Sequence, residues 1–228
     1  MDEETARVVD RVIRERRTTK VLANEAFPPV GARETVEEIV AVAGWAPFHK
    51  PAAKVHLEAS AQASIVPWRF HLVDAPGCRA LREVLLARGD KSKIPRMLAA
   101  ATALVQATWL PNPPKGEAAG LFEATEENME HVAAAGAAVQ SLLLAATARG
   151  IPTYWSSGGV LRGAEAFGWL GIPGREILLG SVFLFPPEHP GAEASPGSHR
   201  DRRGTVSDWS RWADLRLPRA ADPTASNG

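Results

Sequence analysis

Residues 132–159 read VAAAGAAVQSLLLAATARGIPTYWSSGG. The apolar positions in the first part of this stretch follow helical spacing: Val132, Ala135, Val139, Leu142, Leu143 and Ala146. They predict a long helix from Thr125 to Ala148, which Gly150 ends as a C-cap residue. Because the helix face is built of small side chains, another helix can approach it closely. The helix is therefore expected at the centre of the domain or at a subunit contact.

A short strand, Ile151 to Trp155, and a loop, Ser156 to Gly159, complete this stretch. Glycine and serine after a strand expose backbone N–H groups that can point at a ligand acceptor. No G-x-G-x-x-G sequence opens a helix here, so the loop is not a dinucleotide fingerprint. Taken alone, a tight turn is the better interpretation.

Periodicity and turn residues predict further elements on both sides of this stretch. Toward the N-terminus, helices are predicted over 5–17, 77–88 and 94–100, and Thr35 opens another helix in a capping box with Glu38. Strands are predicted over 68–73 and 103–109. Between these elements lie a loop over 24–31, an irregular segment over 48–63, and a loop over 111–116 that is expected to form a lid or a binding rim. Toward the C-terminus they are a helix over 162–170 and a buried strand over 177–185. The pattern predicts one α+β domain over residues 1–217, with an extended C-terminal arm over 186–217 and a disordered tail over 218–228.

The composition fits a globular domain in a reducing compartment. The chain has 228 residues, of which 45% are hydrophobic and 23% charged. Twenty-six basic residues balance 26 acidic residues, so the charge does not indicate a nucleic-acid partner. The N-terminus is acidic and does not resemble a signal peptide, and the most apolar stretch is too weak for a membrane span. With Cys78 as the single cysteine, no intrachain disulfide can form, and a cytoplasmic location is expected.

Two cationic segments are candidates for binding an anion. Arg16, Arg17, Thr18 and Lys20 close the first predicted helix, and arginine forks with threonine hydroxyls suit phosphate oxygens. Residues 199–203, with sequence HRDRR, could complete the same site. A solvated helix end is the alternative for the first segment, and it is the better interpretation when that segment is taken alone. A solvated charge run is the alternative for residues 199–203.

Together, four segments resemble the nitroreductase family. In chain order they are the helix-end Arg16-Arg17-Thr18, the strand that begins Pro67-Trp68-Arg69-Phe70, the loop Gly150 to Gly159 after an alanine-rich helix, and the C-terminal arginines. The similarity extends from about Arg7 to Leu215. It implies a nitroreductase-like fold with a mixed sheet flanked by helices, and an intertwined homodimer that holds FMN in a groove at the subunit interface.

The resemblance also implies roles for particular residues. Arg16, Arg17, Thr18 and Lys20 would hold the phosphate and the polar edge of the flavin ring, Ser157 and Gly158 would offer backbone N–H groups to the N5/O4 edge, and Arg202 or Arg203 would close on the phosphate. The chain departs from the family pattern where an asparagine contacts the flavin, because residues around 49–63 are inserted there. Counting back from Trp68 places Ser64 at that position, and a serine cannot replace both the donor and the acceptor of an amide.

The function implied is an FMN-dependent oxidoreductase that passes electrons from NAD(P)H to a nitroaromatic or quinone by a ping-pong mechanism. The flavin carries the chemistry, so no catalytic side chain is expected. Two alternatives stay open: a flavin enzyme with a dedicated substrate that it dehydrogenates or dehalogenates, and a flavin-binding module without redox activity. His49, His56 and His71 fit no metal-ligand spacing, so no metal site is expected.

Overall fold

A computed structural model describes residues 2–58, 63–114 and 122–215 of the chain. The predicted tail over 218–228, part of the 49–63 insertion and the end of the 111–116 loop lie outside these residues. The chain divides into two compact units after Gly197, and each is described by itself.

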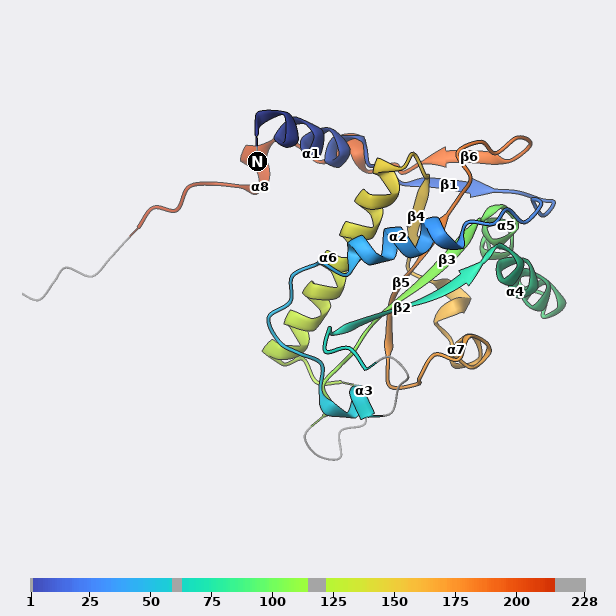
Figure 1. The fold of residues 1–228 in the computed structure, drawn as a ribbon, viewed down its shortest axis with the longest axis horizontal. Helices are drawn as coiled ribbons and strands as arrows, with labels where there is room; N and C mark the ends of the chain where they lie inside the picture. The colour runs from blue at the N-terminus through green and yellow to red at the C-terminus, as the bar shows by residue number, and fades with distance from the viewer. Residues whose placement is uncertain (1, 59–62, 115–121, 216–228) are drawn as a thin grey trace, which may run out of the picture. The chain divides into compact units, whose positions relative to one another are not determined.

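The first unit contains a four-stranded sheet and a two-stranded sheet (Figure 1). Its strands are β1 (Thr19–Leu22), β2 (Trp68–Asp74), β3 (Ala103–Trp109), β4 (Thr153–Ser156), β5 (Ile177–Leu184) and β6 (Glu193–Pro196). Its helices are α1 (Glu3–Glu15), α2 (Arg33–Ala43), α3 (Lys54–Glu58), α4 (Ala75–Ala87), α5 (Ile94–Ala100), α6 (Glu126–Ala148), η1 (Gly159–Arg162) and α7 (Ala164–Leu170). The larger sheet has the order β2-β3-β5-β4 and the smaller sheet pairs β1 with β6.

Every ladder between these strands is antiparallel, so the prediction of a mixed sheet is wrong. The parallel pairing found among the described residues is a single bridge between Thr18 and Thr153. A parallel ladder needs a long crossover that returns the chain to the same edge. Here Thr18, the residue before β1, forms a single bridge to Thr153 of β4, and no parallel ladder continues from it among the described residues.

The two faces of the larger sheet are covered by different helices (Figure 1). Side chains alternate along β3, so Val105 and Ala107 pack with α2 and α6, whereas Leu104 packs with α4 and α5. Phe183 on β5 joins the second group. The result is an α+β domain of three layers, with α2 and α6 on one side and α4 and α5 on the other.

Helix α6 is the core helix of this domain. Its small-residue face lies inside the same chain: Ala135, Ala138, Val139, Leu142 and Ala146 are each at most 1% exposed. These residues face the sheet and α2, so of the two places expected for this face they occupy the centre of the domain. Small side chains serve here to bring α6 close to its own sheet. α6 is also the one described helix long and apolar enough to span a membrane, and this burial accounts for its composition.

Among the elements that differ from the sequence prediction are α1, α2 and α3. Helix α1 ends at Glu15, because Arg16 leaves the helical conformation with ψ 120° and the β-branched Thr18 and Thr19 continue as extended chain. Helix α2 begins at Arg33 after Ala32, and the predicted capping box at Thr35 does not form. Part of the segment predicted as irregular forms the short helix α3.

The start of the predicted extended arm folds back on the first unit. Its residues Glu193 to Pro196 form β6, which pairs with β1 in the register Lys20 to Ser195. The second unit is short among the described residues. It contains η2 (Arg200–Arg202) and α8 (Val206–Trp209), and a capping box between Thr205 and Asp208 begins α8.

Candidate functional site

A pocket of about 280 Å³ lies where the chain enters β1 beside β4 and α6. It is lined by Arg16, Thr18, Gln140, Leu143, Thr153 and Trp155. The bridge from Thr18 to Thr153 fixes the two strands here, and the Gly197 N–H donates to the Thr18 carbonyl over 2.9 Å. The structure therefore brings together two of the predicted anion-binding residues, Arg16 and Thr18.

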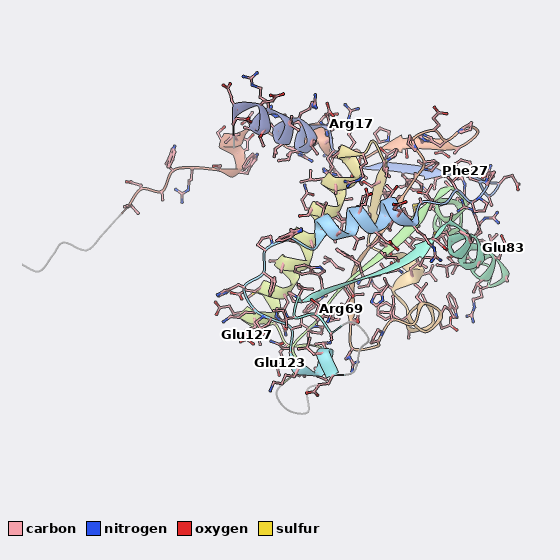
Figure 2. All side chains as sticks on the ribbon, in the orientation of Figure 1. Arg17, Phe27, Arg69, Glu83, Glu123 and Glu127 are labelled. Atoms are coloured by element: carbon pink, nitrogen blue, oxygen red, sulfur yellow. The ribbon has the colours of Figure 1, made fainter. Side chains whose placement is uncertain are left out.

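The neighbouring cations have different surroundings. Arg17 is exposed and does not line this pocket; Figure 2 labels it just beyond α1. Lys20 is partly buried, and its Nζ lies 4.9 Å from the centre of the Tyr154 ring on β4. This cation–π contact fixes the Lys20 ammonium beside the strand that leads into the glycine loop.

The loop after β4 has a defined backbone geometry. Gly158 and Gly159 have positive φ values of 101° and 52°, which other residues rarely adopt. Gly158 is buried, and its N–H donates to Ser156 Oγ over 3.2 Å. The Ser157 carbonyl accepts from Arg162 Nε over 3.1 Å and from Arg162 Nη2 over 2.6 Å. The predicted N–H donors of this loop are thus not equivalent, because Gly158 already donates within the loop.

Ser64 lies elsewhere in the first unit. It is exposed, its Oγ accepts from the Val66 N–H over 3.4 Å, and its carbonyl accepts from Arg69 Nη2 over 2.8 Å. Ser64 precedes β2 and Ser157 follows β4, and these two strands are the opposite edges of the sheet, roughly 14 Å apart at about 4.8 Å per strand. Figure 2 likewise shows Arg69 well separated from Arg17. One protomer does not bring Ser64 to the pocket of Arg16 and Thr18.

Arg202 and Arg203 belong to the second unit. Both side chains are exposed, and Arg202 is the last residue of η2. Their predicted contact with a phosphate stays a prediction.

A buried polar cluster joins β2, β3 and the start of β5. Glu176 is 4% exposed, and its Oε2 accepts from His71 Nε2 over 2.8 Å and from Thr108 Oγ1 over 2.5 Å. Burial alone would raise the pKa of Glu176, but the hydrogen bonds from His71 and Thr108 and the positive charge of Arg69 lower it. This carboxylate therefore stays ionised and anchors the residue before β5 to β2 and β3.

Two buried histidines hold backbone carbonyls of the chain that follows β3. His56 on α3 is buried, and its Nε2 donates to the Pro111 carbonyl over 2.8 Å. His131 on α6 holds the neighbouring Leu110 carbonyl through Nδ1 over 2.7 Å. Burial lowers the pKa of His56 below its ordinary value of 6.5 and outweighs the hydrogen bond to Pro111. Within the described ranges no group of three His, Cys, Asp or Glu side chains could hold a metal ion.

The residues around the pocket fit the phosphate-bearing end of a flavin nucleotide. Arg16 offers a guanidinium, Thr18 and Thr153 offer hydroxyls, and these groups suit phosphate oxygens. Leu143 and Trp155 form an apolar wall. Pockets for whole cofactors usually measure about 300–1,000 Å³, so this pocket suits part of FMN. The chemistry of the donor set thus agrees with the cofactor that the sequence predicts.

Sequence reasoning missed several residues of this region. Gln140 and Trp155 line the pocket, and Arg162 holds the Ser157 carbonyl. Helical periodicity places Gln140 outside the apolar stripe of α6, which was a usable signal for a polar contact. No local pattern indicates that Arg162 turns back toward Ser157, since this depends on the short helix η1.

Comparisons with known proteins agree on one family. The sequence model of the nitroreductase family matches residues 13–183. A nitroreductase-like family protein from Bacillus cereus has 20% identity and a TM-score of 0.62, covering 91% of this chain and 96% of its own. A nitroreductase from Lactococcus lactis in complex with nicotinic acid has 13% identity and a TM-score of 0.59, over 90% and 99% of the chains. A nitroreductase with bound FMN from Desulfitobacterium hafniense has 18% identity and a TM-score of 0.52, over 94% and 100%. Among curated proteins, none matches the sequence.

Proposed function

Because the chain belongs to the nitroreductase family and is an NAD(P)H-dependent flavin oxidoreductase of that family, we propose that it uses FMN to reduce a small organic acceptor such as a nitroaromatic or a quinone. One observation carries the proposal: Arg16 and Thr18 share a pocket with β4, the strand that leads directly into the glycine loop. The proposed anion site thus lies beside β4, and the loop of backbone donors follows directly after the same strand. FMN binding by the relatives from Desulfitobacterium hafniense supports the same cofactor.

Different residues of this chain contact different parts of the cofactor. Arg16, Arg17 and Thr18 bind the phosphate, and Lys20 lies toward the polar edge of the ring. Ser157 presents its N–H to the N5/O4 edge, while Arg202 or Arg203 closes on the phosphate. When bound, FMN supplies the redox chemistry by accepting a hydride from NAD(P)H and passing the electrons on.

The protein's part is to orient the bound molecules and to stabilise negative charge. The fixed Lys20 ammonium, 4.9 Å from the Tyr154 ring, offsets charge that develops near the polar edge of the ring. No side chain of the described site needs to act as a general acid or base. The buried Cys78 is no nucleophile, because burial raises the pKa of its thiol to about 12.

A homodimer completes the site. The pocket of one protomer suits only part of FMN, and Ser64 lies at the opposite edge of the sheet. A second copy supplies the part of the FMN site that one protomer lacks. The C-terminal arm over residues 186–217 extends the contact between the copies. This arm belongs to the same domain, which covers residues 1–217. We place this dimer in the cytoplasm, in agreement with the single, buried cysteine.

A dedicated acceptor is the second candidate, and the inserted segment favours it. His56 of α3 fixes the insertion to Pro111, at the start of the loop predicted as a lid. A rigid wall next to that loop would restrict which acceptors enter. Comparing turnover across quinones, nitroaromatics and halogenated phenols separates a broad acceptor range from a narrow one.

The reaction is tested by steady-state kinetics of the flavin-loaded protein. One flavin site implies that the nucleotide leaves before the acceptor enters, so double-reciprocal plots should give parallel lines. NADH and NADPH are each varied against a quinone and a nitroaromatic. Intersecting lines would contradict the shared site. A purified protein that binds FMN but is reduced by neither nucleotide would support the flavin-binding module instead.

A further inference from the structure

The peptide group between Ser157 and Gly158 is held at both of its ends. Its carbonyl, which belongs to Ser157, accepts two hydrogen bonds from Arg162, at 3.1 and 2.6 Å. Its N–H, which belongs to Gly158, donates to Ser156 Oγ over 3.2 Å. In a trans peptide these two groups point in opposite directions, so the two contacts together fix the orientation of the whole plane.

The surroundings prevent this peptide group from relaxing. A methyl group added to Gly158 would come within 2.6 Å of Leu178 Cδ2 and 3.3 Å of Ser181 Oγ. Arg162 also bonds the Leu178 carbonyl, so its guanidinium joins the loop to β5. On the other side of the strand, Gly180 allows Trp155 and the Ser156 backbone to lie against β5, because a side chain there would collide with both. The loop is therefore packed against β5 from two directions.

We propose that Ser156 and Arg162 are positioning residues that clamp this peptide group and leave the Ser157 N–H as the loop's donor to the flavin. The inference rests on the proposed function, since it names which residues of the same site orient the cofactor contact. The Ser156 hydroxyl oxygen accepts from the Gly158 N–H, so the N–H groups of Ser157 and Gly158 do not compete for the same acceptor on the flavin. Arg162 keeps the Ser157 carbonyl turned away, which removes a repulsive oxygen from the electron-rich edge of the ring.

The test compares variants that keep or remove each contact. Ser156→Ala removes the hydroxyl, whereas Ser156→Thr retains it as the matched control. Arg162→Gln removes the guanidinium group that donates two hydrogen bonds to the Ser157 carbonyl. Thr108→Val controls for the loss of a buried hydroxyl on the same sheet, because Thr108 bonds Glu176 and does not contact the loop. For each variant the rate of flavin reduction is measured over a range of NAD(P)H concentrations up to saturation, together with the visible spectrum of the bound flavin and the thermal midpoint.

Ser156→Ala and Arg162→Gln should slow flavin reduction about three- to tenfold, the factor expected for one ordinary hydrogen bond, and should shift the flavin spectrum. The KM for the nucleotide should stay unchanged, and Ser156→Thr should restore the rate. Thr108→Val should lower the thermal midpoint without changing the rate. Equal rates in Ser156→Ala and wild type, with flavin bound and reduced, would overturn the clamp alone. A wild-type protein that binds no flavin would overturn the clamp and the proposed function together.

Discussion

At the scale of single residues, neighbouring cations have different environments. Arg16 lines the pocket beside Thr18, whereas Arg17 is exposed and is not among the residues that line it. Extended chain places successive side chains on opposite sides, so residues 16 and 18 share a side that residue 17 does not. The sequence motif alone treats these residues as equivalent. The end of α1 at Glu15 makes them different.

This difference leads to a prediction on phosphate recognition. Arg16→Ala should weaken binding of FMN more than binding of riboflavin, because riboflavin lacks the phosphate and Arg16 lines the pocket proposed for it. A hydrogen bond to a charged group contributes roughly 1.5–3 kcal/mol, or about one to two decades in affinity. Calorimetric titration of both ligands measures the effect, with Arg17→Ala as the companion variant. Equal losses for FMN and riboflavin in Arg16→Ala would remove this residue from the phosphate site.

A second residue-scale prediction concerns His56. Its pKa is lowered by burial, so the folded state binds a proton less readily than the unfolded state. The stability that neutral His56 contributes is complete above its ordinary pKa of 6.5 and is lost as the pH falls through the lowered folded value. Nearby Arg69 and Arg175 oppose the charged form, and Glu176 favours it.

The measurement is the thermal midpoint between about pH 7.5 and about pH 5.5. Wild type should lose stability over this range more steeply than His56→Gln, which keeps an N–H donor for Pro111 but does not titrate. The pKa of Glu176 lies below its ordinary value of 4.5, so this carboxylate stays ionised throughout the range. Parallel slopes for the two proteins would show that His56 does not control acid sensitivity.

At the scale of elements, the loop after β4 connects local geometry to the reaction. Ser157→Pro should slow flavin reduction sharply, because proline has no N–H to donate. Ser157→Ala keeps that N–H and should have a mild effect. Stopped-flow measurement of flavin reduction compares the two variants, with circular dichroism as a check of folding. Similar rates in both would show that the backbone of this loop is not the contact.

The helices and strands also differ in how well the sequence predicts them. The long helix, β3 and β5 were predicted closely, because strong periodicity or continuous apolar runs reflect burial within the domain. Strands β1 and β6 were missed, since each has four residues and is defined by pairing between segments more than 170 residues apart. In the candidate site, too, residues of a local motif can be predicted, whereas residues brought together by distant contacts cannot. Arg16 and Thr18 belong to a short motif, whereas Gln140, Trp155 and Arg162 reach the region only through tertiary packing.

At the scale of the whole molecule, apolar surface indicates an association that a single chain does not satisfy. Helix α1 has no buried residue, and Val8, Val9 and Ile13 on its apolar face are 44%, 48% and 48% exposed. In the second unit, Trp209 and Trp212 are 68% and 99% exposed. An amphipathic helix is stabilised mainly by packing of its apolar face, so α1 needs a partner surface.

We therefore expect a dimer when the full chain is sized by light scattering at micromolar concentration. Val9→Asp with Ile13→Asp should shift the equilibrium toward monomer, because two charges on the apolar face of α1 oppose its burial. Arg11→Asp is the matched control, since it changes a charge elsewhere on the same helix and should leave the dimer intact. If the site needs both copies, the monomeric variant should also lose FMN affinity, whereas the control should retain it. A wild-type monomer at this concentration would contradict the dimer, and a monomeric variant with full FMN affinity would show that one protomer holds the cofactor alone.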